Sequence, residues 1–275
     1  MKLLLASIAL CACLTSPAVF AQRYPFNEAG VTMGHWHLNS RDVEASKKIF
    51  VGMGGTPVKV GDFDVVRFPG VLVYLHLRQP AQPASGGTVG SVINHVGFIV
   101  NDVQSSVARW KAAGVPVLPG SNGRLDQAYV VTDDGLRIEI LEDKAQTVPI
   151  RHEHVHLYLP EAVIPEAQAW YVRVFGAKAG ERQKAPVADV PGVQMRFAKS
   201  DAPQATSRGR VLDHFGVDVR DIDAFMQKAA ASGAKIERPI ARNEQTRDAL
   251  AFISDPWGTM IEINERHSSL KIISE

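Results

Sequence analysis

The sequence predicts an α+β protein made of four copies of one β-α-β-β-β unit. Three observations predict this fold class: an internal repeat, an alternating apolar pattern at the start of each copy, and a helical apolar pattern after it. Each copy opens with a histidine, and successive opening histidines are 60, 59 and 60 residues apart. These histidines are His35, His95, His154 and His214.

The second copy shows the pattern of a unit most clearly. Val96 and Phe98 alternate with a polar and a small residue, as in a strand with one buried face. Val103, Val107 and Trp110 then recur at spacings of four and three, which predicts an amphipathic helix. Extended segments separated by turn residues complete the unit as three more strands. An acidic residue follows each opening histidine by seven positions: Asp42, Asp102, Glu161 and Asp221.

The composition is that of an ordinary globular protein. Of the 275 residues, 45% are hydrophobic and 21% are charged, which excludes a disordered, a collagen-like and a coiled-coil chain. There are 30 Lys+Arg against 29 Asp+Glu, and this balance argues against a nucleic-acid partner. The length suits one large domain or two ordinary ones.

Residues 1–21 have the pattern of a secretory signal peptide. Met1-Lys2 precedes an apolar run over Leu3–Leu14, and Val19-Phe20-Ala21 is a small-residue cleavage pattern. A buried N-terminal helix and a lipoprotein signal that uses Cys13 are the alternatives. Cleavage would make the chain periplasmic or secreted and would remove both of its cysteines. No later segment stays apolar over ~18 residues, so we expect no membrane contact after cleavage.

The repeat, its opening histidines and one further string of residues carry a resemblance to a known family. Asp255-Pro256-Trp257-Gly258 runs into Ile261-Glu262-Ile263 at the end of the fourth copy. Over residues 31–265 the sequence resembles the vicinal oxygen chelate superfamily, which includes glyoxalase I, extradiol dioxygenases and bleomycin-resistance proteins. The resemblance implies that units pair into two cupped mixed sheets with helices outside, and that a divalent metal ion can bind in a cup. We expect a first domain over 31–142 and a second over 151–265, separated by the polar linker Asp143–Pro149.

Strand alternation proposes the metal ligands. It turns Glu139 and His95, on separate strands, toward the cup face of the sheet. It turns Glu262 and His214 toward the cup face in the same way. Two imidazoles and a carboxylate suit Fe(II), Zn or Mn, and the resemblance adds Ni. Hydrogen-bonded structural histidines are the alternative, but a buried carboxylate without a cation is costly. Each half of the chain thus offers one ligand set: His35, His95 and Glu139, then His154, His214 and Glu262.

His76 and Tyr129 are the candidate catalytic residues. Alternation in Val71–Leu77 turns His76 toward the ligand face, where the resemblance gives glyoxalase-like members a fourth ligand. Tyr129 lies ten residues before the glutamate of the first half, and alternation does not decide which way it points. In the second half Gln194 and Arg196 face inward. Gln194 is a weak metal ligand, and Arg196 cannot bind a metal ion.

Three further histidines are less informative. His37 and His156 each follow an opening histidine by two residues, so they share its strand face. We expect them to support the ligands or to contact a substrate. His152 precedes the third repeat, and we expect it at the surface.

Three functions remain open at this point. Glyoxalase-like lyase or isomerase chemistry on a small oxygenated molecule is favoured. The alternatives are an extradiol-type dioxygenase and a metal-free protein that binds or sequesters a small molecule, as bleomycin-resistance proteins do. In all three functions the partner is a small molecule. The chain can be a monomer or a homodimer, and a dimer is not required because four units suffice for two cups.

Overall fold

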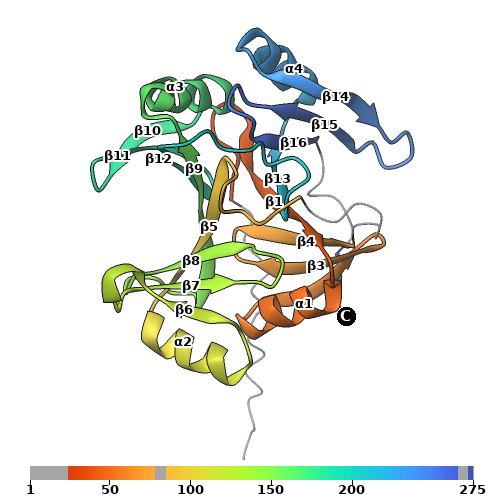
Figure 1. Cartoon of the computed structure of the whole chain (residues 1–275). Helices are drawn as coiled ribbons and strands as arrows, with labels where there is room; N and C mark the ends of the chain where they lie inside the picture. Colours follow the sequence, from red (N-terminus) through yellow and green to blue (C-terminus); the bar gives the residue numbers. More distant parts are fainter. Residues whose placement is uncertain (1–23, 78–84, 266–271, 275) are drawn as a thin grey trace, which may run out of the picture.

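The structure is a computed structural model, and it describes residues 24–77, 85–265 and 272–274 (Figure 1). The expected signal peptide, residues 1–21, lies outside these ranges. Within them no helix is both long and apolar enough to cross a membrane.

The chain contains the four predicted β-α-β-β-β units. The first consists of β1 (Val31–Ser40), α1 (Val43–Gly52), β2 (Thr56–Val60), β3 (Phe63–Phe68) and β4 (Val71–Leu77). The second consists of β5 (Ile93–Val100), α2 (Val103–Ala112), β6 (Val117–Pro119), η1 (Ser121–Gly123), β7 (Gln127–Val131) and β8 (Arg137–Glu142). The third consists of β9 (Ile150–Leu159), η2 (Glu161–Val163), α3 (Ile164–Phe175), β10 (Lys178–Arg182), β11 (Ala185–Val190) and β12 (Val193–Lys199). The fourth consists of β13 (Leu212–Val219), α4 (Ile222–Ala231), β14 (Lys235–Arg242), β15 (Ala249–Ser254) and β16 (Met260–Glu265).

The strands form two mixed sheets, with the four helices on the outside (Figure 1). The nine-stranded sheet has the order β14-β15-β16-β13-β1-β4-β3-β2-β17, where β17 is Ile272–Ser274. The eight-stranded sheet has the order β10-β11-β12-β9-β5-β8-β7-β6. The predicted fold class, four units paired into two mixed sheets, is therefore confirmed.

The two units of each half of the chain lie in different sheets. In the nine-stranded sheet β1 of the first unit pairs antiparallel with β13 of the fourth. In the other sheet β5 of the second unit pairs antiparallel with β9 of the third. The chain changes sheets between β4 and β5 and again between β12 and β13. Alternation within a strand fixes which face a residue occupies, but it does not say which strand lies beside it.

The two units of each half instead pack through their helices and the backs of their sheets. The Trp110 indole of α2 donates a hydrogen bond to the Met53 carbonyl just after α1, and Trp170 of α3 donates to Ser232 after α4. Between the sheets, the Trp36 ring of β1 lies 5.2 Å from that of Phe98 in β5. One hydrophobic core therefore joins both sheets, and their opposite faces remain for the sites.

Three of the four predicted acidic residues begin helices. Asp42, Asp102 and Asp221 are the N-caps of α1, α2 and α4, and each side chain accepts a hydrogen bond from the backbone N–H three residues later. The side chain of Glu161 does not cap α3, because the short helix η2 separates it from the start of α3. The repeated acidic position is therefore a helix-start signal.

Candidate metal centres

Two clusters of histidine and glutamate lie at corresponding places in the two sheets. The first cup, on the nine-stranded sheet, brings together His35, His37, His214 and Glu262. The second cup, on the eight-stranded sheet, brings together His95, Glu139, His154 and His156. Within each cluster the possible ligand atoms all lie within 4.8 Å of one another.

All six predicted ligands lie in these clusters, but in groupings that differ from the prediction. The expected sets took both histidines from one half of the chain. The structure instead joins His35 to His214 across the β1–β13 pair, and His154 to His95 across the β5–β9 pair. Each cup thus takes ligands from both halves because its two opening strands come from different halves.

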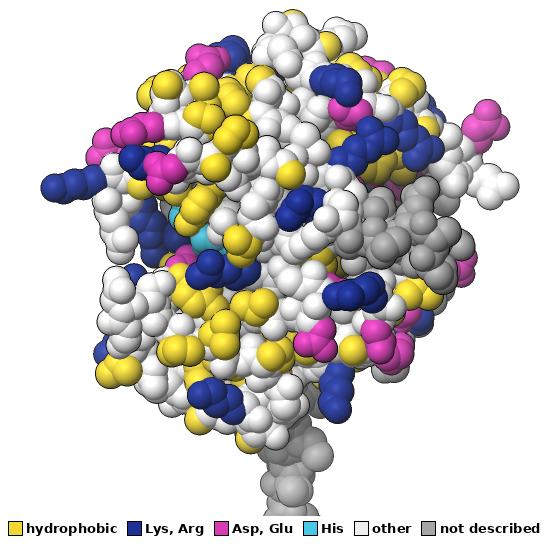
Figure 2. All heavy atoms as spheres, viewed as in Figure 1, with side chains coloured by type: hydrophobic (Ala, Val, Ile, Leu, Met, Phe, Trp, Pro, Cys, Tyr) yellow, Lys and Arg dark blue, Asp and Glu magenta, His cyan; other side chains and the backbone are white. Residues whose placement is uncertain are grey.

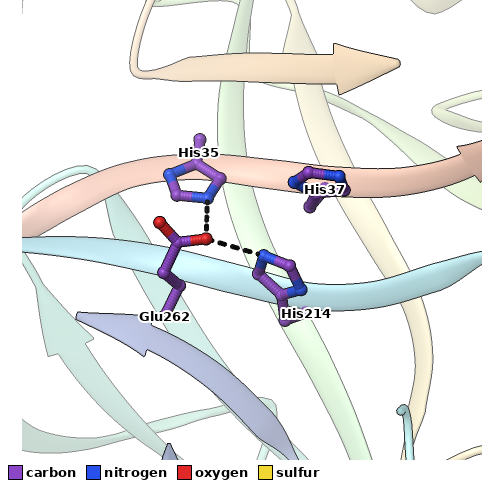
Figure 3. Close-up of side chains that lie close together, drawn as sticks. All are labelled: His35, His37, His214 and Glu262. Carbon is purple, nitrogen blue, oxygen red and sulfur yellow. Dashed lines mark hydrogen bonds and ion pairs between the residues drawn. The ribbon is translucent and has the colours of Figure 1, made fainter. Parts of the chain in front are cut away.

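In the first cup Glu262 lies between two histidines (Figure 3). Its Oε2 atom is 3.0 Å from Nε2 of His214 and 3.5 Å from Nε2 of His35. His37, two residues along β1, completes the group, with its ring centroid 4.7 Å from that of His214. His35, His214 and Glu262 are buried, whereas His37 is half-buried.

Two glycines make room for these rings. Gly216 of β13 pairs with His35, and a Cβ atom at Gly216 would lie 2.0 Å from Cε1 of the His35 ring. In the second cup Gly97 pairs with His154, and a Cβ atom there would lie 1.9 Å from Cε1 of His154. The His-x-Gly pattern of the second and fourth units is the sequence signal for these contacts, because only glycine leaves room for the facing ring.

Asp213 orients the His214 ring from behind. Its Oδ1 atom lies 2.8 Å from Nδ1 of His214, so Nε2 of that ring is turned toward Glu262. Burial alone would lower the pKa of His214, but the hydrogen bonds with Asp213 and Glu262 outweigh burial and raise the pKa to about 9. Burial would likewise raise the pKa of Glu262, but His35 and His214 hold it well below its usual value. Burial and the neighbouring histidines lower the pKa of His37 to about 3.

The first cup opens into a cavity of about 800 Å³. His35, His37 and Glu262 lie at its wall together with aromatic side chains of both partner units. These aromatic residues are Phe63, Tyr74 and Phe252. Arg238 and Arg242 of β14 also line it. A cavity of this size can hold a small organic molecule against the cluster.

The second cup has the same core but more polar contacts. Oε2 of Glu139 is 3.3 Å from Nε2 of His154 and 3.5 Å from Nε2 of His95. The Gln127 amide and, at 3.4 Å, the Tyr129 hydroxyl donate to its other oxygen. Figure 2 shows the molecule hollowed between the β10–β12 and β6–β8 edges, with a histidine inside and Lys or Arg side chains beside it.

An arginine lies within the second cup. Nη1 of Arg196 is 3.8 Å from Glu139, and its Nη2 atom donates to both oxygens of Glu153. Glu153 also accepts from Arg182 at 2.9 Å and lies 2.5 Å from Nδ1 of His154. Burial would raise the pKa of Glu153, but His154 and Arg196 outweigh it and lower the pKa to about 2.

The candidate catalytic residues fall in different cups. His76 is exposed at the end of β4 in the first cup, where its ring centroid lies 5.6 Å from that of His37. Tyr129 is buried in the second cup and points at Glu139. Both residues belong to the first half of the chain, but β4 and β7 lie in different sheets, so the two side chains are in different cups. The surface position expected for His152 is wrong: β9 begins before it, and its ring is buried against Trp36.

The donor set of the first cup fits a divalent metal ion. Imidazole nitrogens and a carboxylate are ligands for Zn, Fe(II), Mn and Ni, and the open cavity leaves positions for a substrate. Asp213 on Nδ1 of His214 is the kind of outer partner that fixes a ligating imidazole. The same donor types occur in the second cup, where Arg196 already contacts the carboxylate.

The comparisons with known proteins agree with this architecture. A family model described as the Glyoxalase/Bleomycin resistance protein/Dioxygenase superfamily matches residues 154–263. Among curated proteins the sequence has no match. Glyoxalase I from Zea mays superposes with a TM-score of 0.66 at 15% identity, over 86% of this chain and 92% of that one. A candidate dioxygenase from Bacillus subtilis subsp. subtilis strain 168 superposes with a TM-score of 0.57 at 17% identity, over 86% of this chain and 85% of that one.

Structural likeness at these identities establishes the fold and leaves the activity to be argued from the site. The matched residues 154–263 run from the first strand of the third unit to the last strand of the fourth. Residues 154–263 therefore match the Glyoxalase/Bleomycin resistance protein/Dioxygenase superfamily, the vicinal oxygen chelate superfamily, and the four units of the chain have the fold of glyoxalase I.

Proposed function

We propose that this protein is a divalent-metal-dependent enzyme that carries out glyoxalase-like lyase or isomerase chemistry on a small oxygenated molecule in the first cup. The observation that carries the proposal is the cluster of His35, His214 and Glu262, of which His35 and Glu262 line a cavity of about 800 Å³. A metal ion held there would supply Lewis-acid chemistry to an oxygenated substrate. We also propose that the chain is exported, as residues 1–21 predict.

The side chains of the first cup divide into three roles. His35, His214 and Glu262 would hold the ion, with Asp213 keeping His214 in the tautomer that presents Nε2. Phe63 and Phe252 supply apolar cavity wall, which excludes water from a bound substrate. His76, exposed beside His37, would exchange a proton between a substrate and solvent.

This proposal is tested by measuring the exchange of substrate protons for deuterium. Protein purified without chelator is loaded with Mn²⁺, Fe²⁺, Ni²⁺ or Zn²⁺ and mixed in D₂O with α-hydroxy-carbonyl compounds. We expect metal-dependent deuterium incorporation next to the carbonyl by NMR, and its loss in Glu262→Gln. Binding without deuterium incorporation or turnover would instead support a binding protein.

A second candidate function is an extradiol-type dioxygenase. The observation that favours it is a tyrosine and a histidine beside a two-histidine, one-carboxylate set. The Tyr74 ring lies 5.1 Å from that of His35, and His76 stands two residues further along β4. Oxygen uptake with a catechol panel, seen with Fe²⁺ and not with Zn²⁺, would select this function over the first.

A further inference from the structure

Tyr74 and Arg196 occupy the same position in the two cups. Tyr74 of β4 pairs with His37 across the parallel β1–β4 ladder. Arg196 of β12 pairs with His156 across the parallel β9–β12 ladder. His37 and His156 are themselves equivalent, because each pairs with the histidine of the opposite His-x-Gly strand. The cups therefore match closely at their ligands and differ at this neighbouring position.

Arg196 supplies the second cup with a positive charge of its own. Arg196 is 8% exposed, and its guanidinium contacts both buried carboxylates, Glu139 and Glu153. Arg182 adds a second cation to Glu153. Two carboxylates thus face two guanidinium groups, and the charge is balanced without a metal ion. A divalent ion at Glu139 would lie beside a buried guanidinium that repels it.

The first cup has no such cation at the corresponding position. Tyr74 is uncharged, and its ring lies edge-on to His35 and stacks on His37. Across the described ranges of the chain, Glu262 forms ion pairs only with His35 and His214. A buried carboxylate with imidazole partners gains much from a divalent ion, because the imidazoles ligate the same ion in their neutral form.

We propose that the residue at this position, Tyr74 in the first cup and Arg196 in the second, determines which cup binds a metal ion. Arg196 is the resident cation of the second cup. The chain therefore binds one divalent ion, in the first cup. This inference rests on the proposed function and deepens it, since it assigns the metal ion to one of two clusters with the same donor types. It gives the second cup a structural role, in which its ion pairs join β9 to β8 and β12.

The test exchanges the two residues and counts bound metal. Wild type, Arg196→Tyr, Tyr74→Arg and the double exchange are purified at full length, titrated with Zn²⁺ in buffer and dialysed, and bound zinc is measured by elemental analysis. We expect about one equivalent in wild type, about two in Arg196→Tyr, and less than a tenth in Tyr74→Arg. The double exchange should hold about one equivalent, lost with Glu139→Gln and retained with Glu262→Gln.

Loss of the Glu153 partner can unfold Arg196→Tyr, so a second set of variants avoids that residue. Glu139→Gln and Glu262→Gln are compared in the wild-type background, with circular dichroism as the check on folding. The inference predicts unchanged zinc in folded Glu139→Gln and its loss in folded Glu262→Gln. Two equivalents in wild type, one of them removed by Glu139→Gln, would overturn it.

The outcomes also separate this inference from the proposed function. If wild type holds one equivalent that Glu262→Gln removes, and a folded Arg196→Tyr gains none, the metal centre stands and the role of Arg196 is wrong. If wild type holds none but Arg196→Tyr gains one, the role of Arg196 stands and the proposed metal centre in the first cup is wrong.

Discussion

Individual residues shape each cup from behind as well as from within. Gly216 and Gly97 leave the space that His35 and His154 fill, and no larger side chain fits without moving those rings. Asp213 holds His214 through Nδ1, and Asn94 holds His95 in the same way at 2.9 Å. The ligand geometry therefore depends on residues that do not themselves ligate.

The two glycines give a matched pair of variants. Gly216→Ala should displace the His35 ring and weaken Zn²⁺ binding at least ~10-fold, while overpacking costs about 1–3 kcal/mol of stability. Gly97→Ala creates the same clash in the second cup and should cost similar stability with no change in zinc affinity. Isothermal titration and chemical denaturation measure both quantities. Equal loss of zinc affinity in the two variants would show that both cups bind the ion.

Asp213 gives a second prediction at this scale. Asp213→Asn keeps the side-chain size but removes the charge that orients and polarises His214, so Zn²⁺ affinity should fall ~10–100-fold. The change Asn94→Ala removes the corresponding contact in the second cup and should leave zinc affinity unchanged. An Asp213→Asn protein with wild-type affinity would show that the contact is only structural.

At the scale of elements, the repeat itself encodes where helices begin. Asp42, Asp102 and Asp221 stand at the same position in three units and cap three helices. The third unit departs because η2 precedes α3 and a proline lies in the first turn of that helix. The equivalent Glu161 side chain is exposed near Lys199 instead.

This difference predicts unequal effects of the same substitution. Asp221→Ala removes the cap of α4 and should lower the free energy of unfolding by about 1 kcal/mol. Glu161→Ala removes only a surface contact and should change it by less than about 0.5 kcal/mol. Urea denaturation of both variants checks this, and an equal loss of stability in the two would refute the assigned cap.

The strands and their faces were predictable from the sequence because side-chain direction has a period of two. Glu139, Glu262 and the four opening histidines all lie on the faces that alternation gave them. The grouping of these residues was not predictable in the same way. Hydrogen bonding between β1 and β13 joins residues about 180 positions apart, and nothing within either strand specifies its neighbour.

At the scale of the whole molecule, one fold holds two cups whose charges are balanced differently. Guanidinium groups offset the carboxylates of the second cup, whereas His214 is the charged partner in the first. The chemistry of Arg196 excludes it as a ligand, but the position of its charge beside Glu139 was not predictable from the sequence. Arg196 lies on β12 of the third unit, Glu139 on β8 of the second, and their contact exists only because these units share a sheet.

The charge on His214 predicts how the metal-free protein responds to pH. Its pKa is about 9 in the folded protein and about 6.5 in an unfolded chain. A raised pKa stabilises the fold fully below pH 6.5, and that stabilisation, up to ~3 kcal/mol, is lost as the pH rises to 9. Chelator-treated wild type should therefore lose stability between pH 6.5 and 9.

The variant His214→Gln isolates this contribution, because glutamine does not titrate. Urea denaturation at several pH values should give a flatter dependence for the variant than for wild type over the same interval. Parallel curves for the two proteins would mean that His214 is neutral in the metal-free fold.

The position of a bound metal ion tests most directly whether the first cup is the metal centre. Crystals of the full-length protein soaked in Zn²⁺ are measured at the zinc absorption edge, and an anomalous difference map locates the ion. We expect one strong peak in the first cup, ~2.0–2.2 Å from nitrogen atoms of His35 and His214 and an oxygen of Glu262. A peak of equal height beside Glu139, or none beside Glu262, would contradict it.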